Sequence, residues 1–358
     1  MADDLNKTVA QAVDAGRSRL SDAIVARQYQ LMPELASKYG DAGREKCLQD
    51  AHYHLSYLAE SIAAALPAMF SDYVAWAKVM LAGRGIPASD LALNLECIRH
   101  ALEEALPQEM SAIASQYIEA GLAQLPQLPS DLPAFIQDGD PSADLAKQYL
   151  AALLRGERHV ASRLILDAVG AGVSVKDVYL NVFQRSQYEI GRLWQTNRVS
   201  VAQEHYCTAA TQLIMSQLYS RIFATEKNGR TLVATCVGGD LHEIGVRMVS
   251  DFFEMDGWDT FYLGANVPLP SIVRTVVERK ADVVAISATI AYHAHKVAEV
   301  IAALREGQLT RGVKILVGGY PFNLAPDLWR QSGADAFARD AEEAIAVANR
   351  LVGVGDLP

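Results

Sequence analysis

Apolar residues recur at spacings of three and four through the first third of the chain, which is the spacing of one face of an α-helix. From Leu5 onward the stretches are rich in Ala and Leu and poor in β-branched clusters. Prolines and turn-forming residues interrupt this pattern between Gln127 and Pro141. We therefore predict an all-α domain over residues 1–125, followed by a linker over residues 126–141.

Four more helical stretches follow over residues 142–226. They are separated at Gly156, at Gly170–Gly172 and near residues 197–200, where each break carries a turn or capping signal. Connections this short favour an antiparallel four-helix bundle. In the third stretch four side chains share one helical face, and most of them are predicted to be core: Tyr179, Phe183, Ile190 and Trp194.

Beyond Lys227 short β-branched runs alternate with amphipathic helical stretches. Such alternation predicts a parallel sheet with helices on both faces, and ligands bind beyond the carboxyl ends of its strands. We therefore predict a multidomain protein whose C-terminal part, residues 227–358, is a Rossmann-like α/β domain with a five-stranded parallel sheet. The predicted strands are residues 231–237, 260–263, 282–288, 313–317 and 336–338.

The composition is typical of a soluble globular protein, with 51% hydrophobic and 21% charged residues. A formal net charge of -10, with no cluster of Lys and Arg, argues against direct nucleic-acid binding. No apolar run reaches the ~20 residues that cross a bilayer, and the first residues lack the order of a signal peptide. We therefore predict a cytoplasmic protein without membrane contact. The cysteines are far apart in sequence and indicate neither a disulfide framework nor a zinc site.

The loop after the first predicted strand carries a histidine between two acidic residues. A neutral imidazole there can donate a lone pair to a metal, while Asp240 accepts the other ring proton and orients the ring. Gly245 would let a bulky group approach the start of the next helix. Taken alone, a loop histidine paired with a neighbouring acid explains the pattern at least as well. The whole run is Asp240, Leu241, His242, Glu243, Ile244 and Gly245.

Two further elements give this histidine a context. Ser287 and Thr289 follow the third predicted strand, and Gly318 and Gly319 follow the fourth. In this order the elements resemble the cobalamin-binding domains of methionine synthase, corrinoid carrier proteins and coenzyme-dependent mutases, over most of the C-terminal domain. The resemblance implies that His242 is the lower axial ligand of cobalt. It also implies that the nucleotide tail of cobalamin inserts into the sheet beside Ser287 and the two glycines.

A second motif lies at the end of the third helical stretch of residues 142–226. Trp194 is followed, after nine residues, by Glu204 and His205. This pattern resembles the light-sensing module of the CarH and LitR family of adenosylcobalamin photoreceptors. The resemblance implies that Trp194 caps the adenosyl group, that Glu204 helps to hold it, and that His205 becomes the upper axial ligand of cobalt after illumination. Taken singly, the three residues also fit a bundle core and a solvated helical turn.

The N-terminal domain departs from that family, whose members carry a DNA-binding helix-turn-helix, because it lacks a basic recognition helix. The order of domains instead resembles the photocobilins, which combine cobalamin with a bilin. That resemblance implies a biliverdin near a group of aromatic and histidine residues, namely His52, His54, Tyr57 and Trp76. A histidine in an apolar stripe is, however, more often a hydrogen-bonded core residue. Cys47 and Cys97, which could form a thioether, are more often buried structural cysteines.

The leading interpretation is therefore a light-sensing regulatory protein and not an enzyme. Photolysis of the cobalt-carbon bond would rearrange the bundle, and a protein signalling partner would read the change in a chain expected to form homo-oligomers. The expected ligands are small-molecule chromophores, adenosylcobalamin and biliverdin. The alternative is a corrinoid methyl carrier of a methyltransferase system. A third possibility is a cobalamin-responsive antirepressor that binds a transcription factor.

Overall fold

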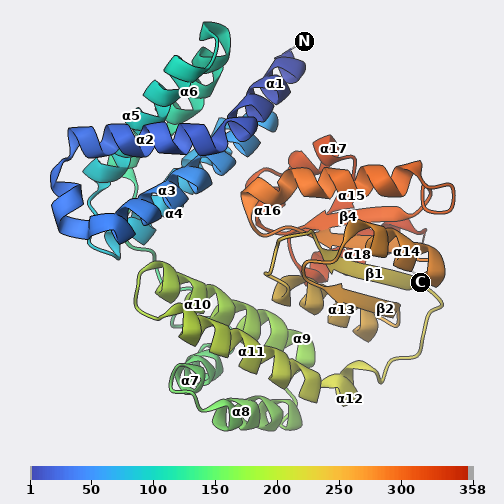
Figure 1. Ribbon diagram of the computed structural model, residues 1–358. Helices are drawn as coiled ribbons and strands as arrows, with labels where there is room; N and C mark the ends of the chain where they lie inside the picture. Colours follow the sequence, from blue (N-terminus) through green and yellow to red (C-terminus); the bar gives the residue numbers. More distant parts are fainter. Residues whose placement is uncertain (1, 354–358) are drawn as a thin grey trace. The chain divides into compact units, whose positions relative to one another are not determined.

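The computed structural model describes residues 2–353 and divides into two compact units, one ending at Asp131 and the other beginning at Leu132 (Figure 1). Residue 1, with which the first predicted domain begins, and residues 354–358, with which the last one ends, lie outside the described residues. No helix within residues 2–353 is both long and apolar enough to cross a membrane.

The N-terminal unit is helical, as predicted, and its core is centred on the third helix, where Leu55, Leu58 and Ile62 are fully buried at helical spacing. Pro67 begins the fourth helix, a position where its missing N–H would have no intrahelical partner. The elements are α1 (Ala2–Ala15), α2 (Arg17–Leu31), α3 (Glu34–Ala63), α4 (Pro67–Ala82), α5 (Ala88–Ala105), α6 (Gln108–Gln124) and the 3₁₀ turn η1 (Leu125–Gln127).

Residues 143–222 form what we call the middle helices. They begin and end at the expected breaks, and Ser200 supports the fourth long helix with a capping box completed by Gln203. The third helix of this group is continuous and consists of α9, the seven-residue π-helical segment η2, and α10. The elements are α7 (Ala143–Leu154), α8 (Arg158–Gly170), α9 (Val175–Asp177), η2 (Val178–Gln184), α10 (Arg185–Gln195), α11 (Val201–Gln217) and α12 (Tyr219–Ile222).

The C-terminal part is a Rossmann-like domain whose five strands are all parallel and lie in the order β2-β1-β3-β4-β5, so the five predicted strands are confirmed. α13 and α18 pack together on one face of the sheet, and α14 and α15 pack together on the other. The strands are β1 (Thr231–Cys236), β2 (Asp259–Gly264), β3 (Val283–Ser287), β4 (Lys314–Gly318) and β5 (Ala336–Phe337). The helices are α13 (Ile244–Met255), α14 (Leu269–Arg279), the 3₁₀ turn η3 (Ala291–His293), α15 (Ala294–Glu306), α16 (Tyr320–Leu324), α17 (Leu328–Ser332) and α18 (Ala341–Leu351).

The middle helices and the sheet share one hydrophobic core, which runs from Tyr149 through Phe183 to Phe252 and the strands. Polar contacts reinforce the junction at α13. Tyr179 donates a hydrogen bond to Asp251 (2.7 Å), and Arg247 donates to the Ser216 hydroxyl (2.7 Å). The junction is therefore a packed interface and not a flexible connection.

Part of the segment predicted as a linker is held against α10. The backbone N–H of Phe135 donates to Glu189 (2.9 Å), and Arg192 donates to the Leu132 carbonyl (3.1 Å). Glu189 and Arg192 are both buried and bond each other through two hydrogen bonds, which leaves neither charge unpaired. Residues 132–135 are thus part of the second unit.

Asp251 gives a pH test of the junction. Burial raises the pKa of this carboxyl from 3.8 to about 6, while the hydrogen bond from Tyr179 and the charge of Arg247 oppose the rise. Because the folded pKa lies above the unfolded one, the contribution of Asp251 to stability is largest below pH 4 and is lost as pH rises through 6.

We therefore expect Asp251→Asn to raise the free energy of unfolding by about 2 kcal/mol at pH 8, because an amide still accepts the Tyr179 hydrogen bond without a buried charge. Urea unfolding of both proteins at pH 4 and pH 8 measures the difference, which should vanish at the lower pH. An equal difference at both values would contradict the assignment.

Candidate functional site

The candidate site lies where β1 and β3 end side by side in the middle of the sheet. The chain leaves β1 toward β2 and leaves β3 toward β4, so the two connections run over opposite faces of the sheet. A crevice is therefore expected beyond the carboxyl ends of β1 and β3. Cys236 and Ser287 are in register, which aligns the loop after β1 with the loop after β3. The predicted metal-binding loop, residues 240–245, is the first of these loops.

Asp240 and His242 form the predicted pair. The Nδ1 atom of His242 lies 2.9 Å from Oδ1 of Asp240, and the His242 backbone N–H donates to the same oxygen (3.1 Å). The other oxygen accepts from the backbone N–H groups of Thr289 (2.6 Å) and Ile290 (3.2 Å). Asp240 is fully buried, so the loop after β3 fixes the carboxylate that orients His242.

The electrostatics of the pair follow from these contacts. Burial alone would raise the pKa of Asp240, but the hydrogen bonds from His242 and the backbone, together with His293 beside it, outweigh burial and hold that pKa far below its usual range. The hydrogen bond to Asp240 raises the pKa of His242, burial lowers it, and the charges of Asp240 and Glu204 raise it further. The carboxylate is thus a fixed negative charge behind the imidazole.

The free edge of His242 suits a metal. Its Nδ1 is taken by Asp240, so Nε2 is the nitrogen that remains for a ligand, and the side chain is 58% exposed. Gly245 has no atom within 4 Å of the position a Cβ would occupy, which leaves room at the start of α13. These features fit a large planar group that brings its own metal to His242.

The remaining residues of the loop have other surroundings. Leu241 is 71% exposed, while Ile244 begins α13 and packs at the edge of the core. Glu243 accepts from Gln212 of α11 (2.9 Å) and from the backbone N–H of Ala265 (3.0 Å). Glu243 therefore joins the middle helices to the loop after β2.

The residues predicted beside the nucleotide tail lie at the ends of β3 and β4. Ser287 and Gly318 are in register, and Thr289 contributes its backbone N–H to Asp240. Gly319 has φ +103°, and a Cβ there would lie 1.9 Å from the Ala288 carbonyl oxygen. Close packing between the two loops is thus by itself sufficient reason for this glycine.

Trp194, Glu204 and His205 lie where α10 ends and α11 begins. Tyr179, Phe183 and Ile190 of the predicted stripe are buried, but Trp194 is only half-buried. The His205 side chain is 74% exposed and pairs through Nδ1 with Glu204. The helix that begins with these residues contacts the loop after β1 farther along, through the hydrogen bond from Gln212 to Glu243.

Two basic residues at this edge were not identified from the sequence. His293 is buried, with Nδ1 3.6 Å from Oδ2 of Asp240, and Lys296 donates to the Gly238 carbonyl (2.9 Å). The available signal was a histidine within the apolar run that follows Ser287. His293 ends the 3₁₀ turn η3 and Lys296 lies in the first turn of α15, and both residues adjoin the loop after β1.

The residues predicted for a bilin belong to the N-terminal unit. His54, Tyr57 and Trp76 gather around Tyr73, whose hydroxyl lies 2.8 Å from Nδ1 of His54 and whose ring stacks on Tyr57 at 3.7 Å. Burial lowers the pKa of His54 to about 4, so this histidine is neutral near pH 7. His52 is two residues from His54, about 200° around the helix axis, and so faces another direction.

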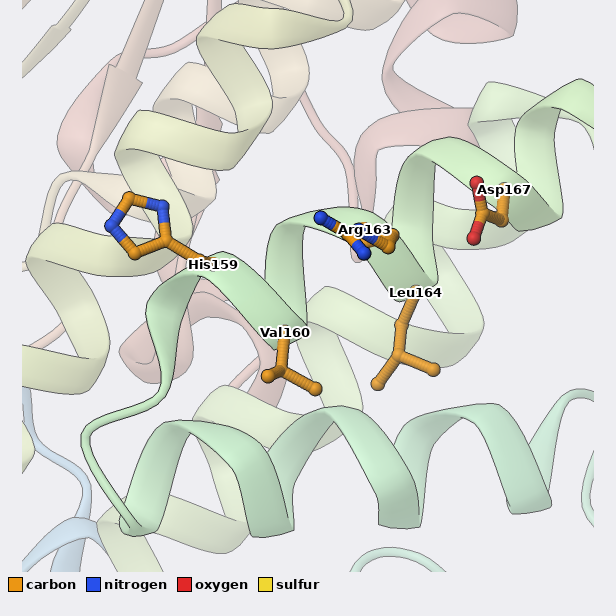
Figure 2. A pocket seen from close by; sticks show the side chains of 5 residues that line it. All are labelled: His159, Val160, Arg163, Leu164 and Asp167. Atoms are coloured by element: carbon orange, nitrogen blue, oxygen red, sulfur yellow. The ribbon is translucent and has the colours of Figure 1, made fainter.

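One surface hollow lies elsewhere. It has a volume of about 270 Å³ and is lined by α8 alone, with His159, Val160, Arg163, Leu164 and Asp167 (Figure 2). None of the predicted site residues lines it. The geometry at the ends of β1 and β3 therefore remains the candidate site.

Comparison with known proteins agrees with this placement. The family described as B12 binding domain matches residues 230–348, and a second family with the same description matches residues 145–219. Residues 3–125 match the family described as phycobilisome protein. The two B12-binding matches cover the middle helices and the Rossmann-like domain, while the third covers the N-terminal unit.

Curated relatives decide the family. Dimethylamine corrinoid protein 3 of Methanosarcina mazei is 32% identical over 130 residues, which are 36% of this chain and 75% of that protein. The chain belongs to the B12-binding corrinoid proteins. Dimethylamine corrinoid protein 2 of the same organism is 36% identical over 130 residues, 36% of this chain. The chain spans 59% of the length of that corrinoid protein.

A solved structure shares the corrinoid-protein fold. The monomethylamine corrinoid protein of Methanosarcina barkeri superimposes with a TM-score of 0.53 at 22% identity, and covers 60% of this chain and 100% of its own. At this identity the likeness concerns the fold alone.

The prediction of a light-sensing regulatory protein is wrong. The relatives that the chain matches are named dimethylamine corrinoid proteins, which agrees with the alternative, a corrinoid methyl carrier. The error came from Trp194, Glu204 and His205, whose spacing reflects only a helix end and the next helix start. Such a spacing does not specify a chemistry.

The roles of His242 and of Asp240, which orients its ring, can be tested by substitution. In the full chain loaded with hydroxocobalamin, His242→Ala should change the absorption spectrum to that of cobalamin without an imidazole ligand. Asp240→Asn should keep that ligand but weaken binding about 10- to 100-fold, since loss of the partner that orients a metal ligand has this effect. His159→Ala on the hollow of α8 is the matched control and should leave both properties unchanged. An unaltered spectrum in His242→Ala would contradict the lower-ligand assignment.

Proposed function

We propose that the protein is a corrinoid methyl carrier of a methyltransferase system. The observation that carries this proposal is the Asp240–His242 pair, held at the carboxyl ends of β1 and β3 with Nε2 of His242 unoccupied by any hydrogen bond within residues 2–353. A buried carboxylate that binds Nδ1 fixes the tautomer in which Nε2 carries a lone pair for a metal.

Each element of the site has a proposed part. His242 would bind the cobalt of the corrinoid, and Ser287 with Gly318 and Gly319 would accommodate its nucleotide tail. The middle helices would act as a four-helix bundle over the upper face of the corrin, away from His242, and three side chains would be directed toward it: Trp194, Glu204 and His205. When bound, the corrinoid supplies a cobalt centre that takes up and releases a methyl group.

The chain's own residues control that centre. Asp240 increases the electron donation of His242, because a carboxylate that accepts the ring proton makes the imidazole a stronger ligand. Trp194 presents a large apolar surface at the end of α10, which would exclude water from the upper face. The proposed protein partner is a methyltransferase, and the proposed location is the cytoplasm.

Reconstitution tests the function. The full chain loaded with hydroxocobalamin, reduced to cobalt(I) and treated with methyl iodide, should give protein-bound methylcobalamin with the histidine ligand retained. Because His242 holds the cofactor between states, His242→Ala should release a larger share of cobalamin in each cycle. Gel filtration with absorption detection measures the retained fraction, and His159→Ala is again the control.

The relative affinity for methylcobalamin and adenosylcobalamin distinguishes a methyl carrier from proteins with other corrinoid-dependent functions. The carrier should bind methylcobalamin at least as tightly as adenosylcobalamin, the form that the resemblance to the photoreceptors implied. Exclusive retention of adenosylcobalamin, or a bound cobalt(I) state that resists methylation, would contradict the proposal.

We also propose that the N-terminal unit binds an open-chain tetrapyrrole such as biliverdin. Support comes from the match of residues 3–125 to phycobilisome protein and from the aromatic cluster around Tyr73. A conjugated planar ligand can stack on such rings, and the neutral His54 can hydrogen-bond a pyrrole or a carbonyl group.

Biliverdin added to the full chain should produce a sharpened and red-shifted absorption band. Tyr57→Leu and Trp76→Leu should each weaken binding by about tenfold, because each removes a stacking surface worth roughly 1 kcal/mol or more. Tyr53→Leu, an exposed change on the same helix as Tyr57, is the control. A band of equal size in all three variants would refute the assigned pocket.

A further inference from the structure

Five polar side chains form a continuous hydrogen-bonded row across the middle helices. The Tyr149 hydroxyl lies 2.9 Å from the Thr211 hydroxyl, which the Gln187 amide approaches to 2.9 Å. The other end of the amide lies 3.2 Å from the Thr208 hydroxyl, which donates to Glu204 at 2.9 Å. Glu204, Thr208 and Thr211 stand four and three residues apart, so they share one face of α11.

The protons of the row can be assigned from the number of donors. Thr208 has a single hydroxyl proton but faces two acceptors, and the charged carboxylate of Glu204 is both nearer and the stronger acceptor. The Gln187 amide must then donate to Thr208, which a half-turn of the amide allows. Its oxygen in turn accepts from Thr211, and Thr211 accepts from Tyr149. In this arrangement every donor of the row points toward Glu204.

The start of the row is rigid. Tyr149 and Thr211 are fully buried in the core that the middle helices share with the sheet. Burial raises the pKa of Tyr149, so its hydroxyl keeps its proton and acts as a donor. Buried hydroxyl groups cost free energy unless they are hydrogen-bonded, and chains of such bonds strengthen one another. A buried anchor therefore supports the half-buried Gln187 and Thr208.

The end of the row is the Glu204 carboxylate, in the first turn of α11. Thr208 binds one oxygen of Glu204, and His205 binds the other. The helix that carries Glu204 also contacts the loop after β1, because Gln212 of α11 donates to Glu243 (2.9 Å). Both oxygens are thus oriented by the protein, and the negative charge has a defined place on the helix that meets this loop.

We propose that Gln187 and Thr208 are positioning residues that hold the Glu204 carboxylate over the upper face of the bound corrinoid, where it selects against anionic ligands of the cobalt. The proposal rests on the proposed corrinoid-binding function. A fixed negative charge repels an incoming anion but leaves a neutral ligand such as imidazole or water almost unaffected. The upper face would thereby stay open to neutral groups.

Ligand exchange measures this selection. The full chain carrying His205→Ala, so that this imidazole does not occupy the upper position, is loaded with hydroxocobalamin and titrated with azide or with imidazole. Absorption spectra give both association constants, and their ratio is the readout because a change in general access alters both alike. Glu204→Gln should raise the azide-to-imidazole ratio about tenfold, the effect of removing one charge at close range.

Substitution of either positioning residue should also raise the azide-to-imidazole ratio. Thr208→Val and Gln187→Leu should each raise the ratio about threefold, since a carboxylate that is no longer held spends less time over the cobalt. Thr208→Ser keeps the hydroxyl and should restore the parent ratio. Gln184→Leu is the matched control, because Gln184 bonds Tyr188 on the same helix and lies outside the row.

The outcomes separate the two proposals. A parent protein that does not retain cobalamin would overturn the proposed function and this inference with it. Retained cobalamin with an unchanged ratio in Glu204→Gln overturns this inference alone. A ratio that changes in Glu204→Gln but not in Thr208→Val or Gln187→Leu overturns the positioning roles.

Discussion

The candidate site depends on one buried carboxylate. Asp240 accepts hydrogen bonds from its own loop at one oxygen and from the loop after β3 at the other, and His293 stands beside it. Without these donors a carboxylate at full burial would be costly, so the two loops and the charge hold one another in place. The orientation of His242 follows from this arrangement, and Lys296 braces the same loop from α15.

The second constraint is the core that the middle helices share with the sheet. Because Tyr179 and Arg247 join the two parts at α13, the middle helices are fixed to the Rossmann-like domain along one side. The side toward the start of α11 is instead polar and more exposed, with Glu204 and His205 at the helix end. The middle helices are therefore attached through an apolar interface and present polar groups at the start of α11.

The fold was predictable because its signals are local. The β-branched runs gave all five strands to within about two residues, and the spacing of Asp240 and His242 was enough to predict their pairing. Contacts made across the sheet were not predictable. His293 reaches Asp240 only because β1 and β3 are neighbours in register, and Gly319 is required by the Ala288 carbonyl rather than by a ligand alone. The function was predicted wrongly because the spacing of Trp194, Glu204 and His205 follows from the end of α10 and the start of α11 and does not specify a reaction.

The π-helical segment η2 lies within the continuous helix formed by α9, η2 and α10. The direction of the side chains after η2 therefore depends on the number of residues in this segment as well as on their chemistry. A π-turn holds one more residue than an α-turn, so it acts as an insertion that later residues of the helix inherit as a rotation of about 100°. Tyr179, near its start, faces α13, whereas Trp194, beyond its end, is only half-buried. Loss of a single residue from Val178–Gln184 would restore an ordinary α-helix and direct Trp194 elsewhere. Related chains that differ by one residue in this segment would thus present a different surface to the same cofactor.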